Sequence, residues 1–304
     1  MLNFLLLIFI YTGIYALMAI GQNLITGYVG LLSLTQAGFF AIGSYVTAIL
    51  TVKMGVNFWL TIPVAILISA FFGLLIGLPT LRLRGDYLAI ATLGFGEIVR
   101  NILNNWDKLT NGPMGIQRIP MVTLFGHTIS PYRKWGFLIL VWSFVLIAYL
   151  LFQRLAKSRL GRALEAIRED EIAASSMGIN VTAYKVWAFI FGAAVAGVAG
   201  SLQAVFILSV APGVFTFMVS IMVLCMVVLG GMGNFKAVIL GALIIQFISY
   251  FPQLTGLTNV IPPQFKQVLF GLILVVMMIW RPQGILGREQ RSAPWRPFSK
   301  RRAK

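Results

Sequence analysis

Apolar residues run along this chain in long blocks that short polar or Gly/Pro-rich stretches separate. The blocks fall at 2–22, 27–52, 57–80, 86–103, 136–153, 185–207, 214–232, 235–251 and 266–281. A membrane-spanning helix needs about 20 predominantly apolar residues, which is close to the length of most blocks. The pattern therefore predicts an all-α integral membrane protein, a polytopic bundle of about eight to ten transmembrane helices.

The stretch from Gly21 to Leu50 is too polar and too rich in glycine for a helix that faces lipid. Backbone groups without hydrogen-bond partners are not tolerated against lipid, so irregular backbone at membrane depth must be enclosed by protein. We therefore expect this stretch to be packed inside the bundle, with helices that are broken or re-entrant. Small residues at GxxxG spacing, Gly73 with Gly77 and Gly192 with Ala196 and Gly200, predict seams of close helix packing.

The composition indicates that lipid is the main solvent of this chain. Of its 304 residues, 59% are hydrophobic and 11% are charged, whereas a soluble domain carries about 25% charged residues. The polar segments that remain are too short for a soluble catalytic domain. Enzyme catalysis within this chain is therefore not expected.

Basic residues outnumber acidic ones by 24 to 8, a formal net charge of +16. A chain this apolar offers no soluble basic face, so nucleic acid is not expected as a partner. Lys/Arg bias instead marks the cytoplasmic side of a membrane protein. The basic residues concentrate in 154–185 and from Arg281 onward, which predicts a cytoplasmic C-terminus. We divide the chain into a membrane domain, 1–287, and a basic cytoplasmic tail, 288–304, that contacts lipid headgroups.

Polar and ionisable residues inside the apolar blocks are candidates for a pathway or gate, because they are costly at membrane depth. Glu97 and Arg100 lie three residues apart on one helical face and can pair. A structural ion pair is the favoured interpretation, and a role in the pathway is the alternative. The uncharged candidates either line a passage or satisfy the backbone of broken helices. They are Thr35, Gln36, Asn101 and Gln203.

The polar segment 154–185 holds half of the acidic residues. Apolar residues recur there at helical spacing: Leu160, Leu164 and Ile167. Asp170 suits the N-cap of a second short helix, and Gly178 suits its end. The simpler interpretation is a solvated loop helix. The sharper one is a docking element, in which the apolar stripe and the small Ala173 and Ala174 enter the groove of a partner protein.

Residues 166–179, Ala-Ile-Arg-Glu-Asp-Glu-Ile-Ala-Ala-Ser-Ser-Met-Gly-Ile, resemble the cytoplasmic coupling motif of ABC-importer permeases. The resemblance is to the LivM-type permease subunit of branched-chain amino acid transporters. Further stretches agree with that family, in family order, at 27–34, 37–45, 112–116, 230–234 and 281–287. Ile172 stands where the general importer motif has an acidic residue, and Thr35-Gln36 stands where the family often has Gly-His.

The resemblance implies a permease that moves Leu, Ile and Val across the bacterial cytoplasmic (inner) membrane. It implies as partners a second homologous, LivH-like permease, two cytoplasmic ATP-binding subunits and a periplasmic or external solute-binding protein. Urea, amides or other amino acids are alternative cargoes, and a stand-alone ion-coupled transporter is the rival class. The ATPase-coupling residues it implies share the segment 161–178: Arg162, Glu165, Arg168, Glu169, Asp170, Glu171, Ala173, Ala174 and Gly178.

No cofactor is expected in this chain. It contains no Gly-x-x-x-x-Gly-Lys-Ser/Thr phosphate loop, so we expect the partner subunits to bind the ATP. His127 is the single histidine and Cys225 the single cysteine, and they are far apart in the sequence. A metal site is therefore not expected either.

Overall fold

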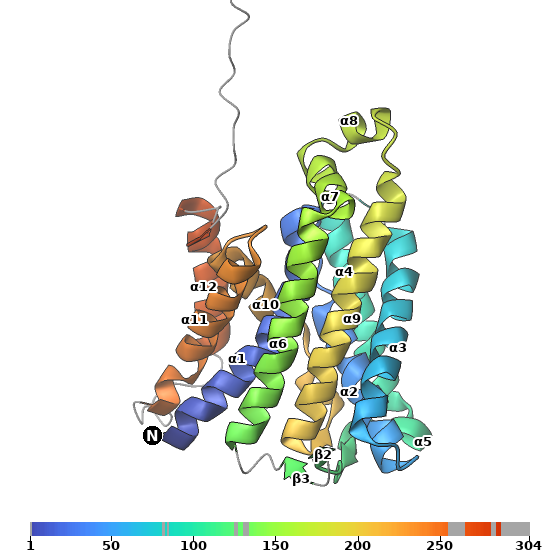
Figure 1. Cartoon of the computed structure of the whole chain (residues 1–304), viewed down its shortest axis with the longest axis vertical. Helices are drawn as coiled ribbons and strands as arrows, with labels where there is room; N and C mark the ends of the chain where they lie inside the picture. Colours follow the sequence, from blue (N-terminus) through green and yellow to red (C-terminus); the bar gives the residue numbers. More distant parts are fainter. Residues whose placement is uncertain are drawn as a thin grey trace, which may run out of the picture.

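The computed structural model describes residues 2–80, 83, 85–124, 127–129, 134–254, 265–280 and 284–286. The predicted basic tail, 288–304, lies outside the described residues. Helices make up most of the described chain (Figure 1). The long helices are α1 (Leu2–Gln22), α2 (Gln36–Val52), α3 (Phe58–Thr80), α4 (Asp86–Asn105), α6 (Lys134–Lys157), α9 (Val181–Ile207), α10 (Phe217–Gly230), α11 (Phe235–Leu254) and α12 (Phe265–Trp280).

Shorter elements connect the long helices. The short helices are α5 (Asp107–Thr110), α7 (Arg159–Glu169), α8 (Glu171–Ser176), a π-helical turn η1 (Asn23–Tyr28) and the 3₁₀ turns η2 (Gly112–Met114) and η3 (Pro212–Val214). Strand β1 (Ile116–Gln117) pairs antiparallel with β4 (Ser209–Val210), and β2 (Val122–Leu124) pairs antiparallel with β3 (His127–Ile129).

Each long helix of the described chain takes up most of one predicted apolar block, which confirms the all-α polytopic bundle. Six segments of the described chain are long and apolar enough to cross a membrane: Asn3–Tyr28, Phe58–Pro79, Lys134–Lys157, Val181–Ile207, Pro212–Gly230 and Phe235–Gln253. Helix α2 is apolar but has 17 residues, and α4 carries charged residues along its length.

The first two blocks divide differently from the prediction. Helix α1 continues as the π-helical turn η1 to Tyr28, and α2 begins only at Gln36. The predicted single block at 27–52 is therefore wrong as one element. Gly30 has φ +81°, a left-handed conformation that glycine adopts readily and that ends the helix. The break is enclosed by protein as expected, since most residues from Gln22 to Gln36 are buried.

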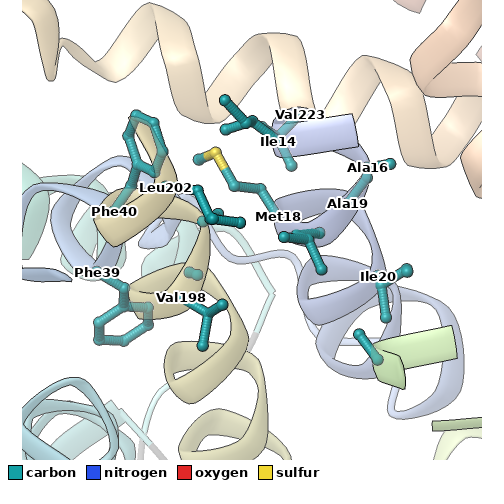
Figure 2. Close-up of a cluster of buried hydrophobic side chains, with 14 of the residues drawn as sticks. Ile14, Ala16, Met18, Ala19, Ile20, Phe39, Phe40, Val198, Leu202 and Val223 are labelled. Atoms are coloured by element: carbon teal, nitrogen blue, oxygen red, sulfur yellow. The ribbon is translucent and has the colours of Figure 1, made fainter. Parts of the chain in front are cut away.

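Helix α9 is the centre of the packing, and the small-residue seams predicted from the sequence lie along it. A Cβ atom built at Gly73 of α3 would lie 2.8 Å from the Cβ of Ala193 on α9. On another side of α9, a Cβ at Gly21 of α1 would lie 2.7 Å from the carbonyl oxygen of Gly192. Larger residues at these positions would push the helices apart. Figure 2 shows the core beside these seams, where Met18 of α1, Phe40 of α2, Leu202 of α9 and Val223 of α10 lie in one cluster.

The two ends of the bundle differ in character. The N-terminus, α5 and the β2–β3 hairpin lie at one end, and α7 and α8 lie at the other (Figure 1). At the N-terminal end, the Nζ of Lys53 donates to the carbonyl of Lys108 at 2.7 Å, and the Nζ of Lys134 donates to the carbonyl of Asn3 at 2.6 Å. The polar segment 154–185 is thus separated from these lysines by the full length of the bundle.

Candidate functional site

The polar segment forms two short helices, α7 and α8, as the sequence predicted. Helix α7 begins at an N-cap, Ser158, whose Oγ accepts from the backbone N–H of Leu160 at 3.2 Å. Its apolar stripe is turned toward the bundle, because Leu164 and Ile167 are buried. The stripe therefore fixes α7 onto the membrane domain and is not available to a partner, which corrects the prediction that it enters a partner's groove.

Asp170 and Gly178 have the structural roles predicted for them. The Oδ1 of Asp170 accepts from the backbone N–H groups of Ile172 at 2.8 Å and Ala173 at 3.0 Å, so Asp170 caps α8. Gly178 has φ +83° and ends the turn after α8. Because Asp170 itself has an extended backbone, α7 and α8 are two separate helices joined at one residue.

An ion pair fastens α8 to the first turn of α9. The Nζ of Lys185 lies 2.8 Å from the Oε2 of Glu171, with the lysine side chain 6% exposed and the glutamate side chain 40% exposed. Asn180, the N-cap of α9, accepts from the N–H of Ala183 at 3.1 Å. The motion of α8 is therefore tied to the start of the long central helix. The sequence marked Glu171 but did not indicate its partner.

The outward surface of α8 carries two large apolar side chains, Ile172 at 72% exposed and Met177 at 84% exposed. Ala173 is exposed beside them, but Ala174 is buried. Ala174 is therefore covered by the chain itself, and Ala173 is the small residue of the pair that a partner can reach. Large apolar side chains exposed at both ends of so short a helix suit a surface that another protein covers.

Arg168 connects α7 to the broken first helix. Its Nη1 donates a hydrogen bond to the carbonyl oxygen of Gly27, near the end of η1. Carbonyls at the end of a helix lack partners in the helix and carry partial negative charge, so a guanidinium is a favourable cap. The side chain also crosses Gly30, where a built Cβ would lie 3.0 Å from the Cγ of Arg168.

A second glycine-rich turn, 230–234, meets the same point. The backbone N–H of Gly233 donates to the Oδ1 of Asn23 in η1 at 2.9 Å. A Cβ built at Gly233 would lie 3.6 Å from the Nη1 of Arg168. We call Asn23, Gly27, Gly30, Arg168 and Gly233 the Arg168 junction.

Residues 284–286 of the C-terminal motif 281–287 hydrogen-bond to the residues that lead into the 230–234 turn. The N–H groups of Ile285 and Leu286 donate to the carbonyls of Leu229 at 2.9 Å and Gly230 at 3.1 Å. Three glycine-rich stretches that are far apart in the sequence, around residues 27–30, 230–234 and 284–286, thus converge beside α7.

Three further residues predicted to couple to an ATPase lie on α7. The Nη1 of Arg162 donates to the carbonyl of Lys157 at 3.1 Å and so links α7 to the end of α6. Glu165 is partly buried on α7, and Glu169 is exposed at its end.

Two of the predicted pathway residues lie at the break before α2. Thr35 and Gln36 are buried, and the Oγ1 of Thr35 lies 3.0 Å from the Oγ of Ser33. The break is held by side chains of distant helices. The Oγ1 of Thr92 on α4 accepts from the N–H of Leu34 at 3.0 Å, and the Oγ of Ser220 on α10 accepts from the N–H of Ala37 at 2.9 Å. Both amide atoms of Gln36 lack a hydrogen-bond partner among the residues that the structure describes.

The remaining candidates do not join Thr35 and Gln36 in one cluster. Arg100 and Glu97 form the predicted pair, with Nη1 3.0 Å from Oε2 and both side chains partly exposed. Asn101 follows on α4 and is exposed. Gln203 is buried on α9, and its Oε1 has no partner in the segments that the structure describes. Among the described residues, no hydrogen bond links Gln203 with the other candidates.

No metal centre is found in the part of the chain that the structure describes, where no group of three or more His, Cys, Asp or Glu side chains comes together. Cys225 is buried on α10. The side chain of His127 lies outside the described residues.

These features define a multi-pass α-helical membrane protein that presents a two-helix polar segment at one end and connects it, through Arg168, to a broken helix in its interior. The chain belongs to the family of the branched-chain amino acid transport system permease component, which matches residues 4–278.

Individual relatives agree with this family. The LivM permease protein of the high-affinity branched-chain amino acid transport system of Salmonella typhimurium is 44% identical over 297 residues, covering 90% of this chain and 68% of the relative. The LivM protein of Escherichia coli matches equally over the same length, at 44% identity, 90% and 68%. The Escherichia coli LivH permease protein is 28% identical over 296 residues, covering 91% of this chain and 92% of the relative. No solved structure matches the chain.

Proposed function

We propose that this chain is the LivM-type permease subunit of an ABC importer that carries branched-chain amino acids into the cell, driven by ATP that separate subunits hydrolyse. The family match and the similarity to LivM proteins support the class. The observation that carries the coupling mechanism is the hydrogen bond from Arg168 to Gly27, which runs from the exposed segment to the broken helix in the interior.

The proposed assembly contains a second, LivH-like permease, two cytoplasmic ATP-binding subunits and an external solute-binding protein. Similarity to both LivM and LivH permeases supports a pair of related permeases. The exposed Ile172 and Met177 suit a contact with an ATP-binding subunit. ATP binding belongs to the partners, and this chain itself contributes no cofactor site and no catalysis.

We place α7 and α8 in the bacterial cytoplasm. Helix α6 ends in Arg154 and Lys157 on the side where the polar segment follows, and an excess of basic residues marks the cytoplasmic face. The N-terminus then faces outward, because it lies at the opposite end of the bundle (Figure 1). On this orientation the membrane domain is 1–287, and the tail 288–304 is cytoplasmic.

In the proposed mechanism, closure of the ATPases displaces α8, and α7 follows as a rigid piece. Arg168 carries the displacement to η1, and Asn23 carries it to the 230–234 turn. The break at 29–35 lets α1 and α2 respond differently, which suits a hinge between inward- and outward-facing states. Thr35 and Gln36 at this break are the pathway residues we favour, because the buried amide of Gln36 has no partner within the described part of the chain.

The rival class, a stand-alone ion-coupled transporter, would need a carboxylate at membrane depth that binds and releases a cation. Glu97 is the candidate for that role, and its pairing with Arg100 at 3.0 Å argues against it. The same pair is the proposed structural support of α4, with Asn101 and Gln203 kept as secondary pathway candidates.

Reconstitution tests this function directly. Proteoliposomes that contain this chain, its permease partner and the ATP-binding subunits should take up radiolabelled leucine when the binding protein is outside and ATP is inside. Omission of the ATP-binding subunits should abolish uptake. Uptake by the permeases alone, driven by an ion gradient, would overturn the proposal in favour of the ion-coupled class. ATP-driven uptake of urea or an amide in place of leucine would overturn the proposed cargo and leave the proposed class of ABC importer standing.

A further inference from the structure

A pocket of about 230 Å³ with mixed polar and apolar lining lies between the end of α6 and the start of α11, and none of the proposed pathway residues lines it. Its α6 wall includes Tyr149, Gln153 and Lys157, spaced four residues apart and so on one face of the helix, together with Ala156. The opposite wall is formed by the first turn of α11, with Lys236 beside the N-cap Asn234. The pocket is therefore built by two helix ends that meet at the same end of the bundle.

The chemistry of the lining favours an anion with several oxygen acceptors. Lys157 and Lys236 supply two ammonium groups, and the hydroxyl of Tyr149 and the amide of Gln153 supply hydrogen-bond donors. No Asp or Glu lies among the residues that line the pocket. The start of α11 adds the positive end of a helix dipole beside Lys236. A phosphate group matches all of these donors.

The surroundings of the pocket indicate that the phosphate comes from a lipid. Below it, Leu150 on α6 and Leu240 on α11 are exposed on the described chain at 49% and 46%. These helices are long and apolar enough to cross a membrane, so their exposed leucines face acyl chains. A lipid whose tails lie along this face would have its headgroup at the level of Lys157 and Lys236. Basic pockets between helices at the membrane boundary bind anionic headgroups in this way.

We propose that this pocket binds the headgroup phosphate of an anionic phospholipid, and that the bound lipid supports the Arg168 junction. The floor of the pocket is Tyr28, which stacks on Phe235 with ring centroids 5.1 Å apart. Tyr28 directly follows Gly27, the acceptor of Arg168. On the rim, the carbonyl of Lys157 accepts from Arg162 of α7. A lipid in the pocket therefore contacts both sides of the connection between α7 and η1.

The test is native mass spectrometry of the full-length chain, purified in detergent with the subunits that accompany it. Samples are exposed in parallel to phosphatidylglycerol, phosphatidylcholine and inorganic phosphate. The wild type should retain phosphatidylglycerol and not phosphatidylcholine. Because each juxtamembrane lysine contributes about fivefold to the binding of an anionic lipid surface, K157Q/K236Q should weaken retention by roughly 25-fold.

Two variants serve as controls. R154Q/R159Q removes the same charge from exposed positions near the end of α6 and at the start of α7, both outside the pocket, and it should retain phosphatidylglycerol as the wild type does. K157R/K236R keeps both charges and should also retain it, so a loss in the glutamine variant alone is not explained by misfolding.

Equal retention by the wild type and K157Q/K236Q would overturn the proposal. Equal retention of phosphatidylcholine would overturn it too, since the charge would then play no part. Displacement of the lipid by inorganic phosphate at similar concentration would assign the pocket to a free anion and overturn the lipid assignment. Lipid binding is measured without transport, so this result is independent of the proposed cargo and coupling.

Discussion

The guanidinium of Arg168 donates a hydrogen bond to the carbonyl oxygen of Gly27, a residue 141 positions earlier in the chain. The contact joins the segment that lies outside the bundle to the end of the helix that is broken inside it. Gly30 and Gly233 leave room for the side chain on either side. A displacement of α7 therefore reaches the interior through one side chain.

Arg168→Ala should uncouple ATP hydrolysis from uptake. Loss of a hydrogen bond from a charged donor costs about 1.5–3 kcal/mol, so the state that depends on this contact should be disfavoured roughly tenfold or more. We expect leucine uptake in proteoliposomes to fall by that factor while ATP hydrolysis continues. Arg159→Ala, an exposed position at the start of the same helix, should leave both rates unchanged. Wild-type uptake in Arg168→Ala would contradict the proposed connection.

Gly27→Ala should destabilise the junction by overpacking. A Cβ at Gly27 would overlap the Oδ1 of Asn23 and lie 2.6 Å from the backbone nitrogen of Gly233, the two atoms that hydrogen-bond with each other. Overpacking of this kind costs about 1–3 kcal/mol. The measurement is thermal unfolding of the purified protein in detergent.

Gly94→Ala is the matched control for this substitution. Gly94 is also a helical glycine, but a Cβ there would meet no atom within 4 Å. Alanine should therefore raise the stability of α4 by about 1 kcal/mol through its helix propensity. The two substitutions should thus shift the unfolding temperature in opposite directions, and a shift in the same direction would count against the packing argument.

Local chemistry explains which parts of the site could be predicted from the sequence. An N-cap and a left-handed glycine act on residues that are two or three positions away, so Asp170 and Gly178 were identified correctly. The helix pattern depends on periodicity alone and was also predictable. The apolar stripe of α7 was identified, but not the side on which it is buried, because periodicity does not say whether a partner or the chain itself covers a face.

Long-range partners could not be predicted. The acceptor of Arg168 is a backbone carbonyl, which any residue possesses, so no residue type in the sequence marks it. The backbone N–H of Gly233, which donates to Asn23, is likewise a group that no residue type marks in the sequence. The glycine-rich stretches were identified as family motifs, but one sequence does not tell which of them meet. Lys185 is one of several basic residues in the segment, and its pairing with Glu171 is visible only in the structure.

The Lys185–Glu171 pair should respond unequally to removal of its two partners. Glu171→Gln leaves the ammonium of Lys185, whose side chain is 6% exposed, without an anionic partner. An unpaired buried polar group costs about 1–3 kcal/mol, and a charged one costs more. Lys185→Met removes the buried charge and leaves a glutamate that is 40% exposed to solvent, so it should cost less.

Hydrogen exchange of α8 in the purified protein measures this difference. We expect faster exchange over Glu171–Ser176 in Glu171→Gln than in Lys185→Met. The double variant should resemble Lys185→Met, since the buried charge is then gone. Equal effects of the two single variants would mean that the pair is fully solvated and does not hold α8 to α9.

Met177→Glu should weaken assembly with the ATP-binding subunits without disturbing the fold. Met177 is 84% exposed at the C-terminal end of α8, so a carboxylate there remains solvated until a partner covers it. Burial of that charge in an apolar contact would cost several kcal/mol, and the affinity of the ATPase should fall at least about tenfold. The measurement is binding of the purified ATP-binding subunit to the permease in detergent.

Met114→Glu is the matched control, because Met114 is 78% exposed on η2 near α5, and this variant should bind the ATPase normally. Equal loss in both variants would indicate a general effect of the added charge, and no loss in either would exclude the outer end of α8 from the ATPase contact.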